Sequence, residues 1–134
     1  MSARSKARKR ALDLIYASEM RNRSAIEALE EQVEAGQVNE YTVELVHGVN
    51  QHRERLDEVI STYAEGWTLQ RMPAVDRNVL RLAVFEVLYV DDVPDAVAVS
   101  EALNLVRDLS TDESPGFVNG VLGNIVRHRE SLQG

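Results

Sequence analysis

The chain has 134 residues, the length of one ordinary domain, and 44% of them are hydrophobic while 28% are charged. This composition is typical of a globular protein and excludes a disordered chain, and the absence of cysteine excludes disulfides, thiol chemistry and thiolate zinc sites. No stretch approaches the roughly 18 apolar residues of a membrane span, so we expect no membrane association. A reducing, cytoplasmic location is compatible with the absence of cysteine.

The charge is divided unevenly along the chain, whose net charge is −7. Residues 1–23 hold seven of the 15 Lys and Arg residues against two acids, so the rest of the chain is strongly acidic. A positive segment attracts polyanions, while an acidic remainder limits non-specific binding. The alternative is a solvated leader that only aids solubility.

The hydrophobic spacing predicts helices throughout and no convincing strand. We expect a first helix over residues 4–20, a second that Ser24 caps and Gly36 ends, and a third that Asn39 caps. The same periodicity continues as far as residue 63. The third helix is therefore either one long helix or two helices joined near Gln51.

A connector over residues 66–73 holds the only tryptophan, Trp67. Asp76 then caps a segment that is apolar almost all round from Val79 to Leu88, which predicts a central, buried helix.

Another helix follows Pro94, and the last begins with Ser114 as N-cap and Pro115 at the first helical position. Together with Pro73, the three prolines of the chain all stand at predicted helix boundaries.

No catalytic constellation is present in the sequence. His47 and His52 are five residues apart and do not share a helix face, so they make a poor metal clamp. Asp91 and Asp92 precede a proline turn, where adjacent acids are typical of loops. Without a glycine-rich phosphate loop or a nucleophile elbow, the chain is predicted to bind and not to catalyse, with no cofactor and no metal.

Basic residues gather on the first helix. Arg4 and Arg8 are one turn apart, and Arg8 is expected to project past the edge of the packed face. Three more basic residues fan out on the other side: Lys6, Lys9 and Arg10.

Arg77 and Arg81 form a second pair, on the predicted central helix. An arginine on a buried helix needs a partner, which is either a carboxylate such as Asp76 or Glu86 or an external phosphate. Tyr63 and Phe117 are candidate platforms for unpaired bases, and the alternative for each is a place in the core.

Three stretches carry a resemblance to a known family: RKRALDLIY at residues 8–16, VDRNVLRLAVFE at 75–86 and SPGFVNGVL at 114–122. In this order they resemble the bacterial transcription antitermination factor NusB family, and the last is close to the family's Phe-Val-Asn-Gly-Val-Leu signature. Residues 21–55 contribute nothing to the resemblance.

The resemblance implies an all-α fold, a compact bundle of about seven helices in two packed helical subdomains, forming one RNA-binding domain over residues 1–134. It implies no enzymatic activity. Family members bind boxA-type single-stranded RNA of ribosomal RNA operons together with NusE, a small-subunit ribosomal protein, and join an antitermination complex on RNA polymerase. Some members are homodimers, and the sequence leaves the oligomeric state open.

The resemblance also implies site residues. Those expected to bind RNA are Arg4, Arg8, Lys9, Arg10, Tyr63, Arg81, Phe117 and Asn119. Those expected to face the NusE-type partner are Tyr16, Met20 and Asp76. We expect Asp112 and Glu113 to repel phosphate wherever they face RNA.

Two alternatives belong to other classes. NusB-like domains also stand at the front of RNA cytosine methyltransferases, but such an enzyme needs a following Rossmann-like domain and a catalytic cysteine, so the length and the lack of cysteine disfavour it. The other alternative is an adaptor that binds proteins and never contacts RNA.

Overall fold

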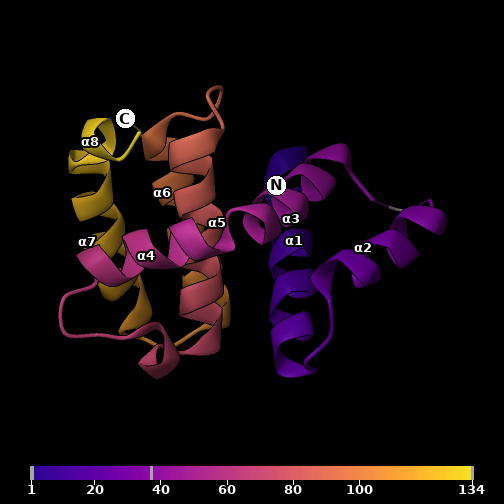
Figure 1. Cartoon of the computed structure of the whole chain (residues 1–134), viewed down its shortest axis with the longest axis horizontal. Coiled ribbons are helices and arrows are strands. Elements are labelled where there is room, and N and C mark those ends of the chain that lie inside the picture. Colours follow the sequence, from indigo (N-terminus) through magenta and orange to yellow (C-terminus); the bar gives the residue numbers. More distant parts are fainter. Residues whose placement is uncertain (1, 37, 134) are drawn as a thin grey trace. The chain divides into compact units, whose positions relative to one another are not determined.

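The computed structural model describes residues 2–36 and 38–133, and every regular element in them is helical. Figure 1 shows them in chain order: α1 (Ala3–Met20), α2 (Ala25–Glu34), α3 (Glu40–Gln51), α4 (Arg53–Tyr63), the 3₁₀ turn η1 (Leu69–Arg71), α5 (Ala74–Tyr89), α6 (Asp95–Leu109), α7 (Ser114–Arg127) and α8 (Arg129–Leu132). The all-helical class is confirmed. The one-turn α8 was not predicted.

The chain divides into two compact units, Met1–His52 and Arg53–Gly134, which we call unit 1 and unit 2. The division into two helical subdomains was expected. The third predicted helix is in fact two helices, because α3 ends at Gln51 and a separate α4 begins at Arg53. No helix in the described part of the chain combines the length and hydrophobicity that crossing a membrane requires.

Side-chain caps define where the helices of unit 1 begin. The Ser24 hydroxyl accepts a hydrogen bond from the backbone N–H of Glu27, and the Asn39 side chain accepts one from Tyr41, as predicted for both caps. After α2 the chain turns at Gly36, whose φ of 75° favours a residue without a side chain.

Within unit 1, α1 packs against both α2 and α3. Ala7 and Ala11 are buried on α1, and such small side chains let helices approach closely. The buried Thr42 hydroxyl on α3 donates a 3.0 Å hydrogen bond to the carbonyl oxygen of Ala7. This bond fixes the position of α3 against α1.

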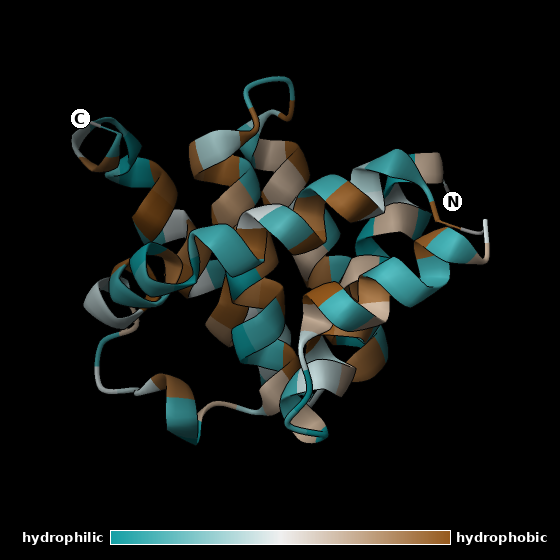
Figure 2. Ribbon diagram, turned by 45° about the vertical axis from the view of Figure 1, so that its right-hand side comes forward, coloured by the Kyte–Doolittle hydropathy of each residue, from teal (hydrophilic) through white to brown (hydrophobic). Residues whose placement is uncertain are grey.

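Within unit 2, α5 is the central element and contacts α4, α6, α7 and α8. All its residues from 78 to 88 are buried, so the predicted central helix is confirmed. Figure 2 shows hydrophobic and hydrophilic residues together on many of the helices, as expected of amphipathic helices that bury one face.

The three prolines stand at helix starts, as predicted: Pro73 and Pro94 immediately precede α5 and α6, and Pro115 lies in the first turn of α7. Two predicted caps were wrong. Asp76 lies inside the first turn of α5, and Ser114 is the first residue of α7 and not its N-cap. Both side chains are instead occupied by hydrogen bonds to Ser110, on the chain that joins α6 to α7.

Candidate nucleic-acid interface

One hollow in unit 2 is lined by two aromatic rings that contact each other. Phe117 in the first turn of α7 meets Trp67 of the connector edge to face, with ring centroids 5.7 Å apart. Together with Pro73 and the start of α7, these rings line a largely apolar hollow of about 310 Å³. Trp67 is 48% exposed and Phe117 is half-buried, so both rings are accessible from solvent.

A hydrogen-bonded network shapes one wall of this hollow. The Ser110 hydroxyl donates to Oδ1 of Asp76 at 2.5 Å, and the Ser114 hydroxyl donates to Ser110 at 3.0 Å. The backbone N–H of Thr111 donates to the Ser114 hydroxyl at 3.2 Å. Because a buried carboxylate requires such donors, this network fixes the chain between α6 and α7 and with it the start of the helix that carries Phe117.

Asp76 is therefore placed differently from what the resemblance suggested. Its carboxylate was expected on the surface that faces the NusE-type partner, but the residue is only 2% exposed. Its hydrogen bond to Ser110 lies inside unit 2. Asp76 lines the aromatic hollow, where it accepts the hydrogen bond from Ser110.

The other aromatic candidate, Tyr63, contacts a different ring. It is half-buried at the end of α4, and its ring centroid lies 5.0 Å from that of His128. Tyr63 does not line the hollow beside Phe117. Asn119, from the same sequence signature as Phe117, is exposed on α7.

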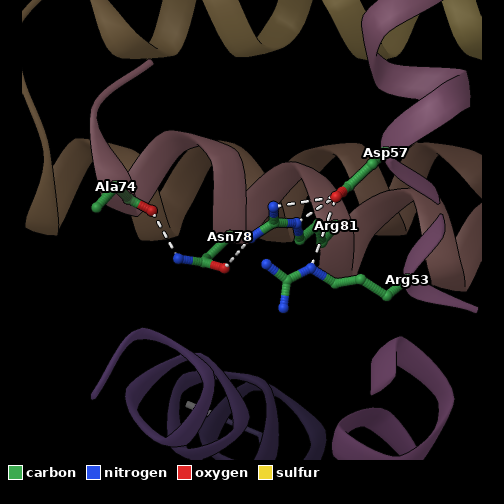
Figure 3. Close-up of polar contacts among 5 residues, drawn as sticks. All are labelled: Arg53, Asp57, Ala74, Asn78 and Arg81. Carbon is green, nitrogen blue, oxygen red and sulfur yellow. Dashed lines mark hydrogen bonds and ion pairs between the residues drawn. The ribbon is translucent and has the colours of Figure 1, made fainter. Parts of the chain in front are cut away.

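Arg81 lies in a closed polar cluster, drawn in Figure 3. Its Nε and Nη2 donate to the two carboxylate oxygens of Asp57 at 2.7 and 3.2 Å, and its Nη1 donates to Asn78 at 2.9 Å. Asn78 in turn donates to the carbonyl oxygen of Ala74, and Arg53 lies 3.6 Å from the same Asp57 carboxylate. The fork-shaped contact uses the planar guanidinium on both edges.

This cluster shows which kind of partner Arg81 has. The sequence left open a carboxylate such as Asp76 or Glu86 or an external phosphate, and the structure pairs Arg81 with a carboxylate, that of Asp57 on α4. With its side chain only 5% exposed, Arg81 joins α4 to α5 as a structural residue. Arg77, one turn earlier, donates from Nη1 to the carbonyl oxygen of Met72 at 2.8 Å.

In unit 1, the basic residues of α1 separate into two groups. Arg4 and Arg8 lie against the ring of Tyr41 on α3, with guanidinium carbons 4.3 and 5.6 Å from its centroid, which are cation–π distances. Arg8 is only 4% exposed, so the expectation that it projects past the packed face was wrong. The sequence could not reveal this burial, because the Tyr41 ring that covers Arg8 belongs to another helix, α3.

The second group is open to solvent. Lys6 and Arg10 are exposed, and Lys9 forms a solvent-accessible ion pair of 3.4 Å with Asp13, one turn further along α1. Exposed pairs of this kind contribute little to stability, so their charges remain available to a ligand.

A pair of exposed apolar residues completes the surface of α1. Tyr16 and Met20 are four residues apart, so they share one helix face, and they are 37% and 49% exposed. Two of the three residues expected to face a protein partner thus lie on one accessible face, and Asp76 does not.

Sequence reasoning treated Trp67 only as part of a connector, although the structure places it in the hollow. The available signal was the chain's single tryptophan, a large aromatic side chain that stands in a connector and not on the apolar face of a predicted helix.

The comparisons with known proteins cover almost the whole chain. The NusB family model matches residues 5–127. A transcription antitermination protein NusB from a Nocardioides species is 63% identical over 98% of this chain and 99% of its own length. One of the same name from an Arthrobacter species is 53% identical, with 98% of each chain covered.

Solved structures agree with the fold. The structure of T. maritima NusB matches with a TM-score of 0.87 at 30% identity, covering 96% of this chain and 94% of that one. A complex described as antitermination factors NusB and NusE with dsRNA contains a chain that matches with a TM-score of 0.81 at 28% identity, covering 92% of this chain and 96% of that one. The family signature at Phe117, the helical fold and these relatives agree: the chain belongs to the NusB family.

Proposed function

We propose that this protein is a transcription antitermination factor that binds boxA-type RNA of ribosomal RNA operons together with a NusE-type ribosomal protein, and so promotes processive transcription by RNA polymerase. The observation that carries the proposal is the family match over residues 5–127, with relatives up to 63% identical that bear the name transcription antitermination protein NusB. The function involves no catalysed reaction, and it takes place in the cytoplasm, where bacterial transcription occurs.

The aromatic hollow of unit 2 supports direct RNA contact. It offers two accessible rings and a volume of about 310 Å³, and unpaired bases are held in proteins mainly by stacking on such rings. Glu113 lines the same hollow, and its carboxylate can accept a hydrogen bond from an amino group of a base. We assign Phe117 and Trp67 to base contact, with Asn119 on the exposed face of the same helix.

The exposed basic residues of α1 are assigned to the phosphates. Lys9 and Arg10 are open to solvent, and Arg4 is half-buried against Tyr41. Arg8 and Arg81 are buried, so we assign them to the support of the helices that carry the contacts and not to the RNA itself. Tyr63, half-buried beside His128, is assigned to a peripheral contact.

A protein partner has a separate surface on α1. Tyr16 and Met20 expose apolar side chains on one helix face, and exposed apolar patches mark contact sites. We assign this face to the NusE-type protein.

Titration of labelled boxA RNA by fluorescence anisotropy, with and without the NusE-type protein, tests the proposal. If about four phosphates are contacted, log affinity should fall against log salt with a slope near −3. We expect weak binding by the protein alone and tighter binding with the partner. A slope near zero in both titrations would contradict direct RNA binding.

The alternative of a protein adaptor gives a different result. In a pull-down with the NusE-type protein, an adaptor keeps its partner and recovers no RNA, whether or not nuclease is added. The proposed factor recovers boxA RNA that nuclease removes.

A further inference from the structure

A groove in unit 1, between α1 and α2, combines three guanidinium groups with a buried acceptor that has no donor. Arg10, Arg21 and Arg23 line this groove of about 360 Å³ together with two acids, Asp13 and Glu31. Asp13 is paired with Lys9, so the arginines leave the groove positive. Gln32 lines it too, and its side-chain oxygen Oε1 is buried without a hydrogen-bond partner among the described residues. An unsatisfied buried acceptor costs free energy, so this atom favours an occupant that brings a hydrogen-bond donor.

The guanidinium groups are available to a ligand. Within the described part of the chain, Arg10 and Arg21 make no side-chain hydrogen bond or ion pair. Arg23 is paired with Glu31, but both side chains are well exposed, at 40% and 65%. Because exposed pairs are worth about 0–1 kcal/mol, an incoming phosphate can replace Glu31 at little cost.

The spacing of Arg10 and Arg21 along α1 fits a ligand that carries several phosphates in a row and not a single anion. Arg10, Leu14, Ala17 and Arg21 all line the groove, at intervals that keep them on one helix face. Eleven residues at about 1.5 Å each place the two arginines about 16 Å apart along the helix axis. Two small apolar residues also line the groove, Ala17 on α1 and Ala28 on α2, and their short side chains take up little of its space.

We infer that this groove holds unpaired RNA that flanks the boxA element, with its phosphates on Arg10, Arg21 and Arg23 and a hydroxyl or amino donor on Gln32. The inference rests on the proposed function. Arg10 belongs to the basic half of α1 that the proposal already assigns to RNA, so the groove continues that surface along the same helix. RNA fits better than an acidic peptide because its 2′-hydroxyls supply donors at regular intervals beside its phosphates.

The test uses the full-length protein with the NusE-type partner and two labelled RNAs, the boxA element alone and the element extended by unpaired nucleotides at both ends. The wild type should bind the extended RNA more tightly. Arg21→Gln should lower affinity for the extended RNA about threefold, the size of one exposed charge pair, and reduce its salt slope by about 0.7. Affinity for the short RNA should not change.

Arg107→Gln is the matched control, because Arg107 is also an exposed arginine at the C-terminal end of a helix. It should affect neither RNA. Glu31→Gln should act in the opposite direction to Arg21→Gln, since it releases Arg23 and removes a negative charge from the groove. Circular dichroism checks that all variants stay folded.

Equal wild-type affinity for the two RNAs would overturn the inference while leaving the proposed function intact. An equal loss on both RNAs in Arg21→Gln would also overturn it, as would a loss of the NusE-type protein with RNA binding unchanged, which would point to a protein ligand. No binding of either RNA would remove the proposed function together with the inference.

Discussion

The first helix of unit 1 and the central helix of unit 2 each carry two arginines four residues apart, but the two pairs are used differently. Arg4 and Arg8 lie against the ring of Tyr41, beside further basic residues that are open to solvent. Arg81 is closed on both edges by Asp57 and Asn78 inside unit 2. The same spacing therefore places one pair against an aromatic ring of a neighbouring helix and brings Arg81 of the other pair into an internal ion pair, and the neighbouring elements decide which.

The largest effect is expected from breaking the buried ion pair between Arg81 and Asp57. Asp57→Ala leaves the Arg81 guanidinium buried without its carboxylate, and the loss of one partner of a buried pair is strongly destabilising. Because Asp57 is 28% exposed, water can replace part of the contact, and we expect a loss of about 2–3 kcal/mol in denaturant unfolding. Asp13→Ala, which breaks the exposed pair with Lys9, should cost less than about 0.5 kcal/mol. Equal losses would remove the contrast between the two helices.

A smaller loss of stability is expected from the hydroxyl network of unit 2. Ser110→Ala removes the donor to the buried Asp76 carboxylate, which should cost about 1–2 kcal/mol in the free energy of unfolding. Ser131→Ala is the control, because its hydroxyl donates to a carbonyl oxygen at an exposed position. A value for Ser110→Ala no larger than the control would mean that water satisfies Asp76.

The hollow of unit 2 is lined by two accessible aromatic rings, and removing one of them should affect binding more than folding. Trp67→Ala should lower affinity for boxA RNA about tenfold, since stacking of one base on an aromatic side chain is worth about 1–3 kcal/mol. Its stability should change little because the ring is half-exposed. Tyr89→Ala, an exposed aromatic outside the hollow, should leave RNA affinity unchanged, and a similar loss there would argue against a defined base site.

The smallest loss of stability is expected in unit 1, from removing the contact between Arg4 and the Tyr41 ring. Arg4→Gln removes the guanidinium that lies 4.3 Å from the Tyr41 ring centroid, which should cost about 0.5 kcal/mol in thermal or denaturant unfolding. Lys6→Gln changes an exposed charge on the same helix and should leave stability unchanged. If both variants unfold alike, the Arg4 contact with the ring contributes nothing.

The helices of this protein could be predicted largely from local chemistry. Ser24 and Asn39 cap helices through bonds to residues two or three positions away, and prolines mark helix starts, so short stretches of sequence contain the required information. The hydrophobic run of α5 likewise predicted that this helix is buried. The family could be recognised from the sequence because its motifs are contiguous, and the family match over residues 5–127 confirmed it.

The site was harder to predict because its contacts join distant residues. Asp57 is 24 positions from Arg81, and Trp67 is 50 positions from Phe117, so neither pairing leaves a trace in periodicity. Arg8 looked accessible for the same reason, since the ring that covers it belongs to α3. The individual RNA and partner contacts remain predictions.

Glu113 gives the aromatic hollow a property that its rings alone would lack. Its carboxylate lines the hollow, where it repels the phosphates of a sugar–phosphate backbone but can accept a hydrogen bond from an amino group of a nucleobase. If the hollow holds a base as proposed, the strand should enter with its backbone turned outward, and a duplex, whose base edges are paired, should bind less well. We expect this acid to act as an orientation filter, so that Glu113→Gln weakens the discrimination between unpaired and paired nucleic acid more than it alters binding strength.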